Sequence, residues 1–256
     1  MQLQRTASAT EIPGAHALGC EHLQMERVLH TSVSPIDALV GGFRSSEVAL
    51  FEGDSRYPSD LLHLLCVKAV AELDEEVVWI DGGNSVDPYA LSALCKRMRI
   101  DRRDVLSRVN ISRAFTAYQL VTLIDERLEE EVGESSPAMV IVSSLTDMFL
   151  DKDMKWMEAY QLLRRCAEDI RRVTRDYETI SLVTDRTPGR VPRNEGMLNL
   201  LRAESDAVVS VKERRDGVLV SLPREGRSAV FHPVPWNQTI LQDFRGDEHG
   251  EDGTHI

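Results

Sequence analysis

Short apolar runs alternate with longer segments of helical periodicity along most of this chain, and this alternation restricts the possible folds most strongly. The apolar runs are Val48–Phe51, Val77–Asp81, Ala138–Val142 and Thr179–Val183. Runs this short and this apolar are typical of strands that are buried on both faces. Helical segments between them suit crossover connections. The pattern predicts an α/β fold with a mostly parallel central sheet flanked by helices.

The helical segments begin with residue types that start helices. Ser59 is a candidate N-cap for the first of them, and Pro88 suits a first helical turn. Between two of the helices, Val109–Ile111 reads as a further short strand. The segments with helical periodicity are 60–73, 88–99, 117–132 and 156–174.

The end of the pattern predicts antiparallel strands. Residues 207–222 form two alternating runs around Arg215, Asp216 and Gly217, and an Asp-Gly pair is a hairpin signal. The chain has 256 residues, of which 42% are hydrophobic, so one core is expected. We predict a core domain over 26–244, a flexible N-terminal arm over 1–25 and a disordered acidic tail over 245–256, because these ends carry few apolar residues.

Charge and cysteine content exclude several classes of protein. The net charge is −12, from 30 Lys and Arg against 42 Asp and Glu, so any contact with nucleic acid has to be local. The four cysteines show no C-x-x-C spacing, which argues for reduced, buried thiols and against a zinc site. No apolar run reaches the roughly 20 residues that span a bilayer, and the start lacks the apolar region of a signal peptide. We expect a cytoplasmic protein.

The segment 48–73 has the strand, loop and helix order of a P-loop, with little of its chemistry. A P-loop uses glycines to let backbone amides surround phosphates, a lysine for the terminal phosphates, and Ser or Thr for magnesium. Here the loop 52–58 keeps Gly53 and Ser55, ends on Pro58, and is followed by Ser59. It also carries the carboxylates of Glu52 and Asp54, which we expect to repel a triphosphate.

Five blocks of sequence resemble the RecA/RadA strand-exchange recombinases, above all archaeal-type RadA. The resemblance runs from Thr31 to Phe244 and implies a RecA-like P-loop core. Its most specific block is 110–119, Asn-Ile-Ser-Arg-Ala-Phe-Thr-Ala-Tyr-Gln, which is similar to the family's N-I-x-x-A-R-A-F-N-S-D-H-Q segment. The other blocks are 31–43, 50–65, 79–84 and 140–146.

Aligned with that family, the chain lacks three groups that the resemblance ties to ATP hydrolysis. Pro58 stands at the P-loop lysine, with Ser59 at the threonine. Gly83 stands at the glutamate that positions the attacking water, and Ser143 at the aspartate that orients magnesium. The resemblance therefore implies degraded Walker A and Walker B motifs, a pseudo-ATPase without catalytic residues, and neither metal nor cofactor. Weak binding of ATP or ADP through Ser55, Ser59 and nearby amides stays open.

The same resemblance suggests where DNA is contacted. Residues 182–186 are similar to the strand end that senses nucleotide in the family, with Asp185 and Arg186 in place of an amide pair. The loop that follows carries Arg190 and Arg193, and together with Arg186 these are candidate contacts to phosphates of single-stranded DNA. Arg214 and Arg215 flank the hairpin turn and are expected to be ordinary surface residues.

Two functions of different classes follow. The first is a non-hydrolysing accessory or regulatory factor in homologous recombination and DNA repair, whose partners are the resident recombinase or other repair proteins, with single-stranded DNA as a further partner. The second is a RecA-like interaction scaffold unrelated to DNA; the acidic composition favours it and the block 113–119 opposes it. An enzyme with a replacement site has least support, because His30 and His63 are isolated from other catalytic residue types.

Overall fold

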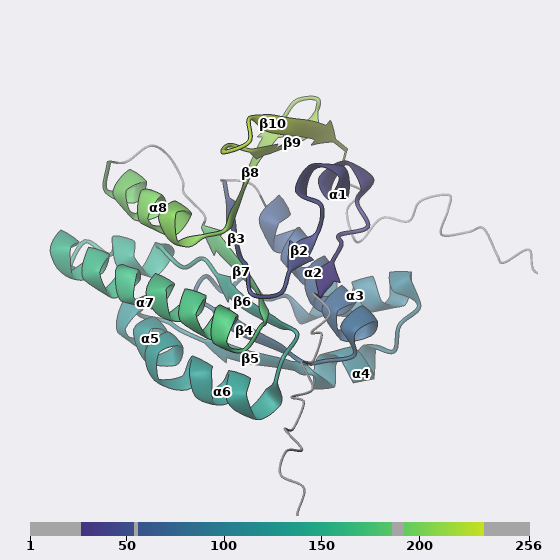
Figure 1. Cartoon of the computed structure of the whole chain (residues 1–256), viewed down its shortest axis with the longest axis horizontal. Coiled ribbons are helices and arrows are strands. Elements are labelled where there is room, and N and C mark those ends of the chain that lie inside the picture. Colours follow the sequence, from purple (N-terminus) through teal and green to yellow (C-terminus); the bar gives the residue numbers. More distant parts are fainter. Residues whose placement is uncertain (1–26, 54–55, 186–191, 233–256) are drawn as a thin grey trace, which may run out of the picture.

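An eight-stranded sheet forms the centre of the molecule (Figure 1). The structure is a computed structural model and describes residues 27–53, 56–185 and 192–232. Six neighbouring strands are parallel, and the two strands that come last in the chain join them by antiparallel pairing. In sheet order the strands are β10 (Arg227–Phe231), β9 (Gly217–Leu222), β8 (Ala207–Arg214), β3 (Val48–Glu52), β7 (Ile180–Asp185), β6 (Met139–Ser143), β4 (Val77–Asp81) and β5 (Val109–Arg113). The predicted α/β fold with antiparallel strands at its end is confirmed.

Helices cover both faces of this sheet. On one face lie α1 (Ser34–Val40), α2 (Tyr57–Leu73), α3 (Pro88–Met98) and α4 (Arg102–Ser107). On the other lie α5 (Ala117–Thr122), α6 (Leu128–Ser135), α7 (Trp156–Asp176) and α8 (Pro192–Glu204). Successive strand residues point to opposite faces, so Ala49 and Phe51 join the first core while Val48 and Leu50 join the second. This is why the central strands read as unbroken apolar runs.

Several elements differ from the sequence prediction. The expected helix over 117–132 is interrupted by a π-helical turn, Leu123–Arg127, between α5 and α6. The 3-10 turn Asp147–Leu150 and the short elements α1, α4 and β10 were not predicted, because they are too short to show a clear period. A two-stranded sheet of β1 (Val28–Leu29) and β2 (Phe43–Arg44) was also missed.

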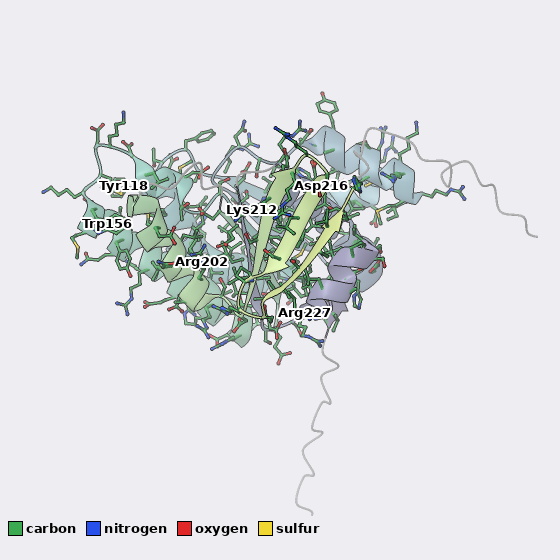
Figure 2. All side chains as sticks on the ribbon, turned by 90° about the horizontal axis from the view of Figure 1, so that it is seen from above. Tyr118, Trp156, Arg202, Lys212, Asp216 and Arg227 are labelled. Carbon is green, nitrogen blue, oxygen red and sulfur yellow. The ribbon has the colours of Figure 1, made fainter. Side chains whose placement is uncertain are left out.

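Strands β8 and β9 form the hairpin that the sequence predicted. Arg214 pairs with Gly217, so the loop consists of Arg215 and Asp216. In Figure 2, Lys212 and Asp216 lie on this antiparallel part of the sheet, whereas Tyr118 and Trp156 lie at the other end of the molecule. The predicted arm 1–25 lies outside the described residues, as does the tail 245–256.

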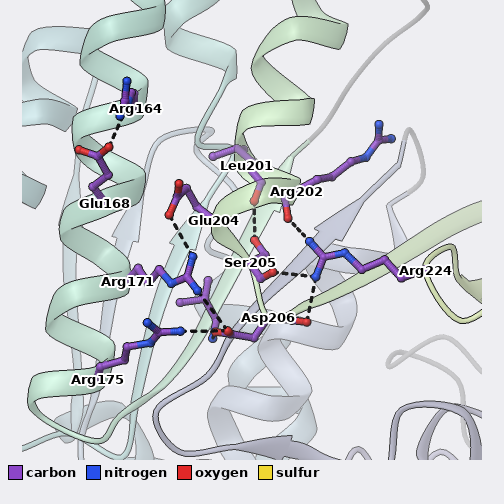
Figure 3. A network of polar contacts seen from close by, with 11 residues as sticks. Arg164, Glu168, Arg171, Arg175, Leu201, Arg202, Glu204, Ser205, Asp206 and Arg224 are labelled. Carbon is purple, nitrogen blue, oxygen red and sulfur yellow. Dashed lines mark hydrogen bonds and ion pairs between the residues drawn. The ribbon is translucent and has the colours of Figure 1, made fainter.

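A polar network joins the end of α8 to α7 and to the strand that follows (Figure 3). Asp206 receives ion pairs from Arg171 at 3.8 Å and Arg175 at 3.3 Å, and its other carboxylate oxygen accepts from the amide of Val48. The guanidinium of Arg224 donates to backbone carbonyls, including that of Ser205 at 2.9 Å. These contacts hold the start of β8 beside β3, whose far end carries the candidate site.

Candidate functional site

The ends of four parallel strands bring the candidate site together. Register pairs Asp81 of β4 with Ser143 of β6, and Glu52 of β3 with Asp185 of β7. Carboxyl ends of parallel strands meet at one edge of a sheet, which is where ligands bind in open α/β folds. The four side chains are buried. The edge is therefore polar and closed to water at the same time.

Asp81 organises the loop that follows β4. Its Oδ1 accepts from the amides of Gly83 at 3.2 Å and Ser85 at 2.9 Å, and from the hydroxyl of Ser143 at 3.0 Å. Its Oδ2 accepts from the amide of Val86 at 3.3 Å. Burial tends to raise the pKa of Asp81, but these hydrogen bonds outweigh it and the pKa lies below its ordinary value.

Ser143 is committed to the same network. Its Oγ donates to Asp81, accepts from the indole Nε1 of Trp79 at 3.1 Å, and lies 2.8 Å from the Oγ of Ser85. Arg113, at the end of β5, adds its Nε at 3.3 Å from Asp81 Oδ2. The hydroxyl of Ser143 thus has its hydrogen-bonding capacity filled by protein groups.

Gly83 packs directly against Ser144. A β-carbon at position 83 would lie 2.2 Å from Ser144 Oγ and 2.5 Å from Ser144 Cβ. Ser144 itself adopts φ +55°, and its Oγ is buried without a hydrogen-bond partner among the described residues. Any side chain at position 83 requires this segment to move.

The helix after the loop starts earlier than the sequence predicted. Helix α2 begins at Tyr57 with Arg56 at its N-cap and no side-chain cap, so the prediction of Ser59 as N-cap is wrong. Pro58 accounts for the shift, because its fixed φ is already helical in the first turn. The amides of Ser59 and Asp60 both donate to the carbonyl of Arg56, at 3.1 and 3.3 Å. They are occupied within the helix start.

A cavity of about 230 Å³ lies beside this helix start. Ser59 reaches across one side with a long hydrogen bond, 3.5 Å, to the carbonyl of Ser85. The pKa of Asp60 in its wall is raised, chiefly by burial. The lining residues are Arg56, Pro58, Ser59, Asp60, Leu62, His63, Ser85, Asp87, Ala90, Ser144 and Thr184.

His63 connects α2 with the start of α3. Its Nδ1 lies 2.6 Å from the carbonyl of Ser59, and its Nε2 accepts from the amide of Asp87 at 2.9 Å. The imidazole also contacts the Trp79 ring, with centroids 5.1 Å apart. Burial lowers the pKa of His63, and the accepting Nε2 requires the neutral ring. The residue is packed, as a lone helical histidine usually is, and it forms part of the cavity wall.

The acidic residues of the loop differ from the sequence expectation in one respect. The Glu52 carboxylate forms two hydrogen bonds with Arg202 of α8, at 2.7 and 3.0 Å, so its charge is already neutralised by a cation. Asp54 and Ser55 lie outside the described residues. Gly53 adopts φ +149°, and a β-carbon there would meet the carbonyl oxygen of Val211 at 2.0 Å, so glycine is required for backbone packing.

The candidate DNA contacts fall mostly outside the described residues. Arg186 and Arg190 lie there entirely, and Arg193 falls within the bounds of α8 without a described side chain. The loop predicted after Arg186 was expected to carry Arg193, and this part of the prediction is wrong, because α8 begins at Pro192, which suits the first position of a helix. Before this segment, the carboxylate of Asp185 accepts a hydrogen bond from Thr146.

Other classes of site find no support in the described part of the chain. No three His, Cys, Asp or Glu side chains gather there in a way that could hold a metal ion. None of the helices described is both long and apolar enough to cross a membrane. Cys66, Cys95 and Cys166 are buried free thiols, as predicted, and burial raises the pKa of Cys166 to about 12.

Sequence reasoning found some site residues and missed others. It selected Gly53, Pro58, Ser59, Gly83 and Ser143, which lie at one edge of the sheet or on the helix beside it. It missed Ser85, Ser144 and Arg202 as partners of these residues. Of these partners, only Ser85 could have been found from a local sequence pattern. It lies in Gly-Gly-Asn-Ser, which follows Asp81, and such a sequence is typical of a turn stabilised by an aspartate side chain.

Comparison with known proteins supports a fold of the RecA type. The Rad51 family model matches residues 25–196, which is more than half of the chain. The chain is also similar to the DNA repair protein RadA of Halalkalibacterium halodurans, with 24% identity over 153 residues, or 59% of this chain and 30% of that protein. The match thus spans under a third of the relative's length. The prediction of a RecA/RadA-type protein is correct at this level, and the chain belongs to the Rad51 family.

Proposed function

We propose that this protein is a non-hydrolysing member of its family that acts as an accessory or regulatory factor in homologous recombination and DNA repair. The observation that carries the proposal is the closed network around Asp81. The hydroxyl of Ser143, at the position that the resemblance assigns to magnesium orientation, is bonded to Asp81 and Trp79. A metal ion there would have to displace these hydrogen bonds.

The remaining residues also fit a nucleotide and its magnesium poorly. Pro58 has neither an ammonium group nor an N–H to offer a phosphate. The amides of Ser59 and Asp60 already donate to Arg56. The cavity, at about 230 Å³, lies below the roughly 300–1,000 Å³ usual for ligand pockets. We infer a pseudo-ATPase in which the nucleotide edge has become a structural contact, and no step of phosphoryl transfer is assigned to it.

Without hydrolysis, such a protein acts through what it binds. Its proposed partners are the resident recombinase or other repair proteins, together with single-stranded DNA through Arg186, Arg190 and Arg193. Membership of the Rad51 family supports the recombination context, since the similar RadA protein is named for DNA repair.

A reconstituted strand-exchange reaction tests this proposal. The purified chain is added to the resident recombinase, and strand exchange and ATP hydrolysis are followed separately. We expect a changed rate or extent of strand exchange with no ATP hydrolysis by the chain alone. Hydrolysis by the chain that disappears in an Asp81→Asn variant would contradict the loss of activity. Strand exchange that is the same with and without the chain would contradict the accessory role.

An interaction scaffold unrelated to DNA is the second candidate. Phe115, Tyr118 and Met157 expose most of their side chains, at 73%, 58% and 61%. Exposed apolar and aromatic groups in one region are typical of protein-binding surfaces. This function is favoured if the chain alters no recombinase reaction and a Phe115→Ser/Tyr118→Ser variant loses a protein partner recovered with the unmodified chain.

A further inference from the structure

Basic side chains gather where α3 ends and α4 begins, on a chain whose net charge is −12. Residues 96–108 contain six basic and two acidic residues. The basic residues are Lys96, Arg97, Arg99, Arg102, Arg103 and Arg108. Helices α3 and α4 follow each other in the chain and pack against each other, so these residues lie in one region, which we call the α3–α4 basic surface.

The acidic residues within this surface are already engaged. Arg108 pairs with Asp104 at 2.9 Å and with Asp74 at 2.5 Å. The carboxylate of Asp101 caps α4 by accepting from the amide of Arg103 at 2.9 Å. Within the described ranges, the exposed side chains of Lys96, Arg102 and Arg103 form no ion pair. Three cations are therefore available to a partner.

Two of these three cations do not help the fold, whereas Lys96 lies in the last turn of α3, where a cation is favourable. Arg102 and Arg103 occupy the first two positions of α4, at the positive end of the helix dipole, where cations are unfavourable. Within the described ranges Arg102 and Arg103 gain no ion pair in return, so a binding partner explains their placement better than the stability of α4 does.

We propose that the α3–α4 basic surface binds the phosphate backbone of duplex nucleic acid. Arginine matches phosphate geometry through paired N–H donors, and arginine outnumbers lysine here. A protein partner would be expected to need an apolar centre, and the exposed large hydrophobic side chain within residues 96–108 is Leu106, at 39%. Binding through charge alone is the chemistry of backbone contacts to DNA.

This surface is distinct from the candidate site. Helix α3 starts at Pro88, beside the cavity, and its eleven residues carry it about 16 Å along its axis, at 1.5 Å per residue. The basic surface lies at the far end of that helix, across the molecule from α8 (Figure 1). The inference needs neither the loss of hydrolysis nor the loop arginines, so it can fail while the proposed function stands.

Fluorescence anisotropy of a short labelled DNA duplex over a series of salt concentrations tests it. The Lys96→Gln/Arg102→Gln/Arg103→Gln variant is compared with Lys212→Gln/Arg214→Gln/Arg215→Gln, which removes the same charge from exposed positions on the β8–β9 hairpin. We expect the first variant to reduce the slope of log K against log salt by roughly 2 to 3, since each phosphate contact contributes about 0.9. The hairpin variant should keep the slope of the unmodified chain.

Three results would overturn the proposal. The first is an equal decrease of the salt slope in both variants, and the second is no salt-dependent DNA binding by the unmodified chain. The third is an α3–α4 variant that binds DNA as the unmodified chain does but no longer binds an acidic peptide that the unmodified chain binds. An Arg186→Gln/Arg190→Gln/Arg193→Gln variant, tested with single-stranded DNA, reports on the proposed function separately. Circular dichroism melts of all variants confirm that each is folded before binding is compared.

Discussion

Gly83 is a tightly packed position of the candidate site, since a β-carbon there would lie 2.2 Å from Ser144 Oγ. We predict that Gly83→Ala lowers the free energy of unfolding by about 1–3 kcal/mol, the usual cost of overpacking. Urea denaturation measures it. Gly133→Ala is the matched control, because a β-carbon on α6 would meet its nearest atom at 3.5 Å and should be neutral or stabilising.

A double-mutant cycle identifies the cause of that loss. If Ser144 is the obstacle, Gly83→Ala should cost much less in a Ser144→Gly background than in the unmodified chain. Equal costs in both backgrounds would mean that Gly83 is required for its backbone and not for its packing. The result bears on function, because a glutamate at position 83 would meet the same obstacle.

We predict that mild acidification lowers the stability of the fold, because His63 is buried in its neutral form. Its folded pKa lies below its ordinary value of about 6.5, because burial disfavours the charged ring. The neutral ring therefore stabilises the fold fully above pH 6.5, and this contribution decreases as the pH falls from 6.5 toward the folded pKa. Asp60, Asp81 and Asp87 act in the opposite direction, by favouring the charged ring.

Thermal denaturation between pH 7 and pH 5 measures this dependence. We expect the melting temperature to fall across the range, and to fall less in a His63→Gln variant, whose amide can donate and accept in place of the ring. The same pH dependence in the unmodified chain and in His63→Gln would show that other groups cause it.

At the scale of elements, one ion pair joins α8 to β3 in addition to the apolar core that the two elements share. Arg202 binds Glu52 through two hydrogen bonds, and the Glu52 side chain is only 8% exposed. We predict that Arg202→Met costs about 2 kcal/mol, below the 3–5 kcal/mol of fully buried pairs because Arg202 itself is one-third exposed. In guanidinium denaturation, the double variant Arg202→Met/Glu52→Gln should regain part of the free energy of unfolding that Arg202→Met alone loses.

An exposed pair on α7 provides the comparison. Arg164 and Glu168 are four residues apart and both largely exposed, so Arg164→Met should leave the free energy of unfolding nearly unchanged. Similar losses for Arg164→Met and Arg202→Met would mean that burial does not decide the strength of these pairs.

The strands were predictable from sequence because each central strand is buried on both faces and therefore reads as an apolar run. The helix starts were less predictable, as Ser59 shows: a residue type that caps helices sits inside α2, because Pro58 fixes a helical φ one position earlier. The site was predictable only at positions that align with a motif, such as Gly83 and Ser143. Partners such as Ser144 and Arg202 come from distant segments, and no local pattern encodes their contacts.

At the scale of the whole molecule, the sheet brings together strand ends that in this protein satisfy one another. Asp81 bonds Ser143 of the neighbouring strand, and Glu52 binds a helix that follows β7 in the chain. A parallel sheet places such ends at one edge whether or not a ligand uses them. Under the proposed function, the fold keeps the geometry of a nucleotide edge, while the side chains at that edge serve stability.

This arrangement predicts how the folded protein responds to nucleotide. A ligand that binds only the folded state raises stability by RT ln(1 + [L]/Kd), which is about 0.4 kcal/mol when its concentration equals Kd. For a chain of this size that corresponds to roughly 1–2 °C in melting temperature. We expect millimolar ATP with magnesium to raise the melting temperature by no more than this, and by no more than sodium sulfate at equal ionic strength. A larger rise that requires magnesium would mean that the metal opens the Asp81 network, and the edge would then have to be treated as a working nucleotide site.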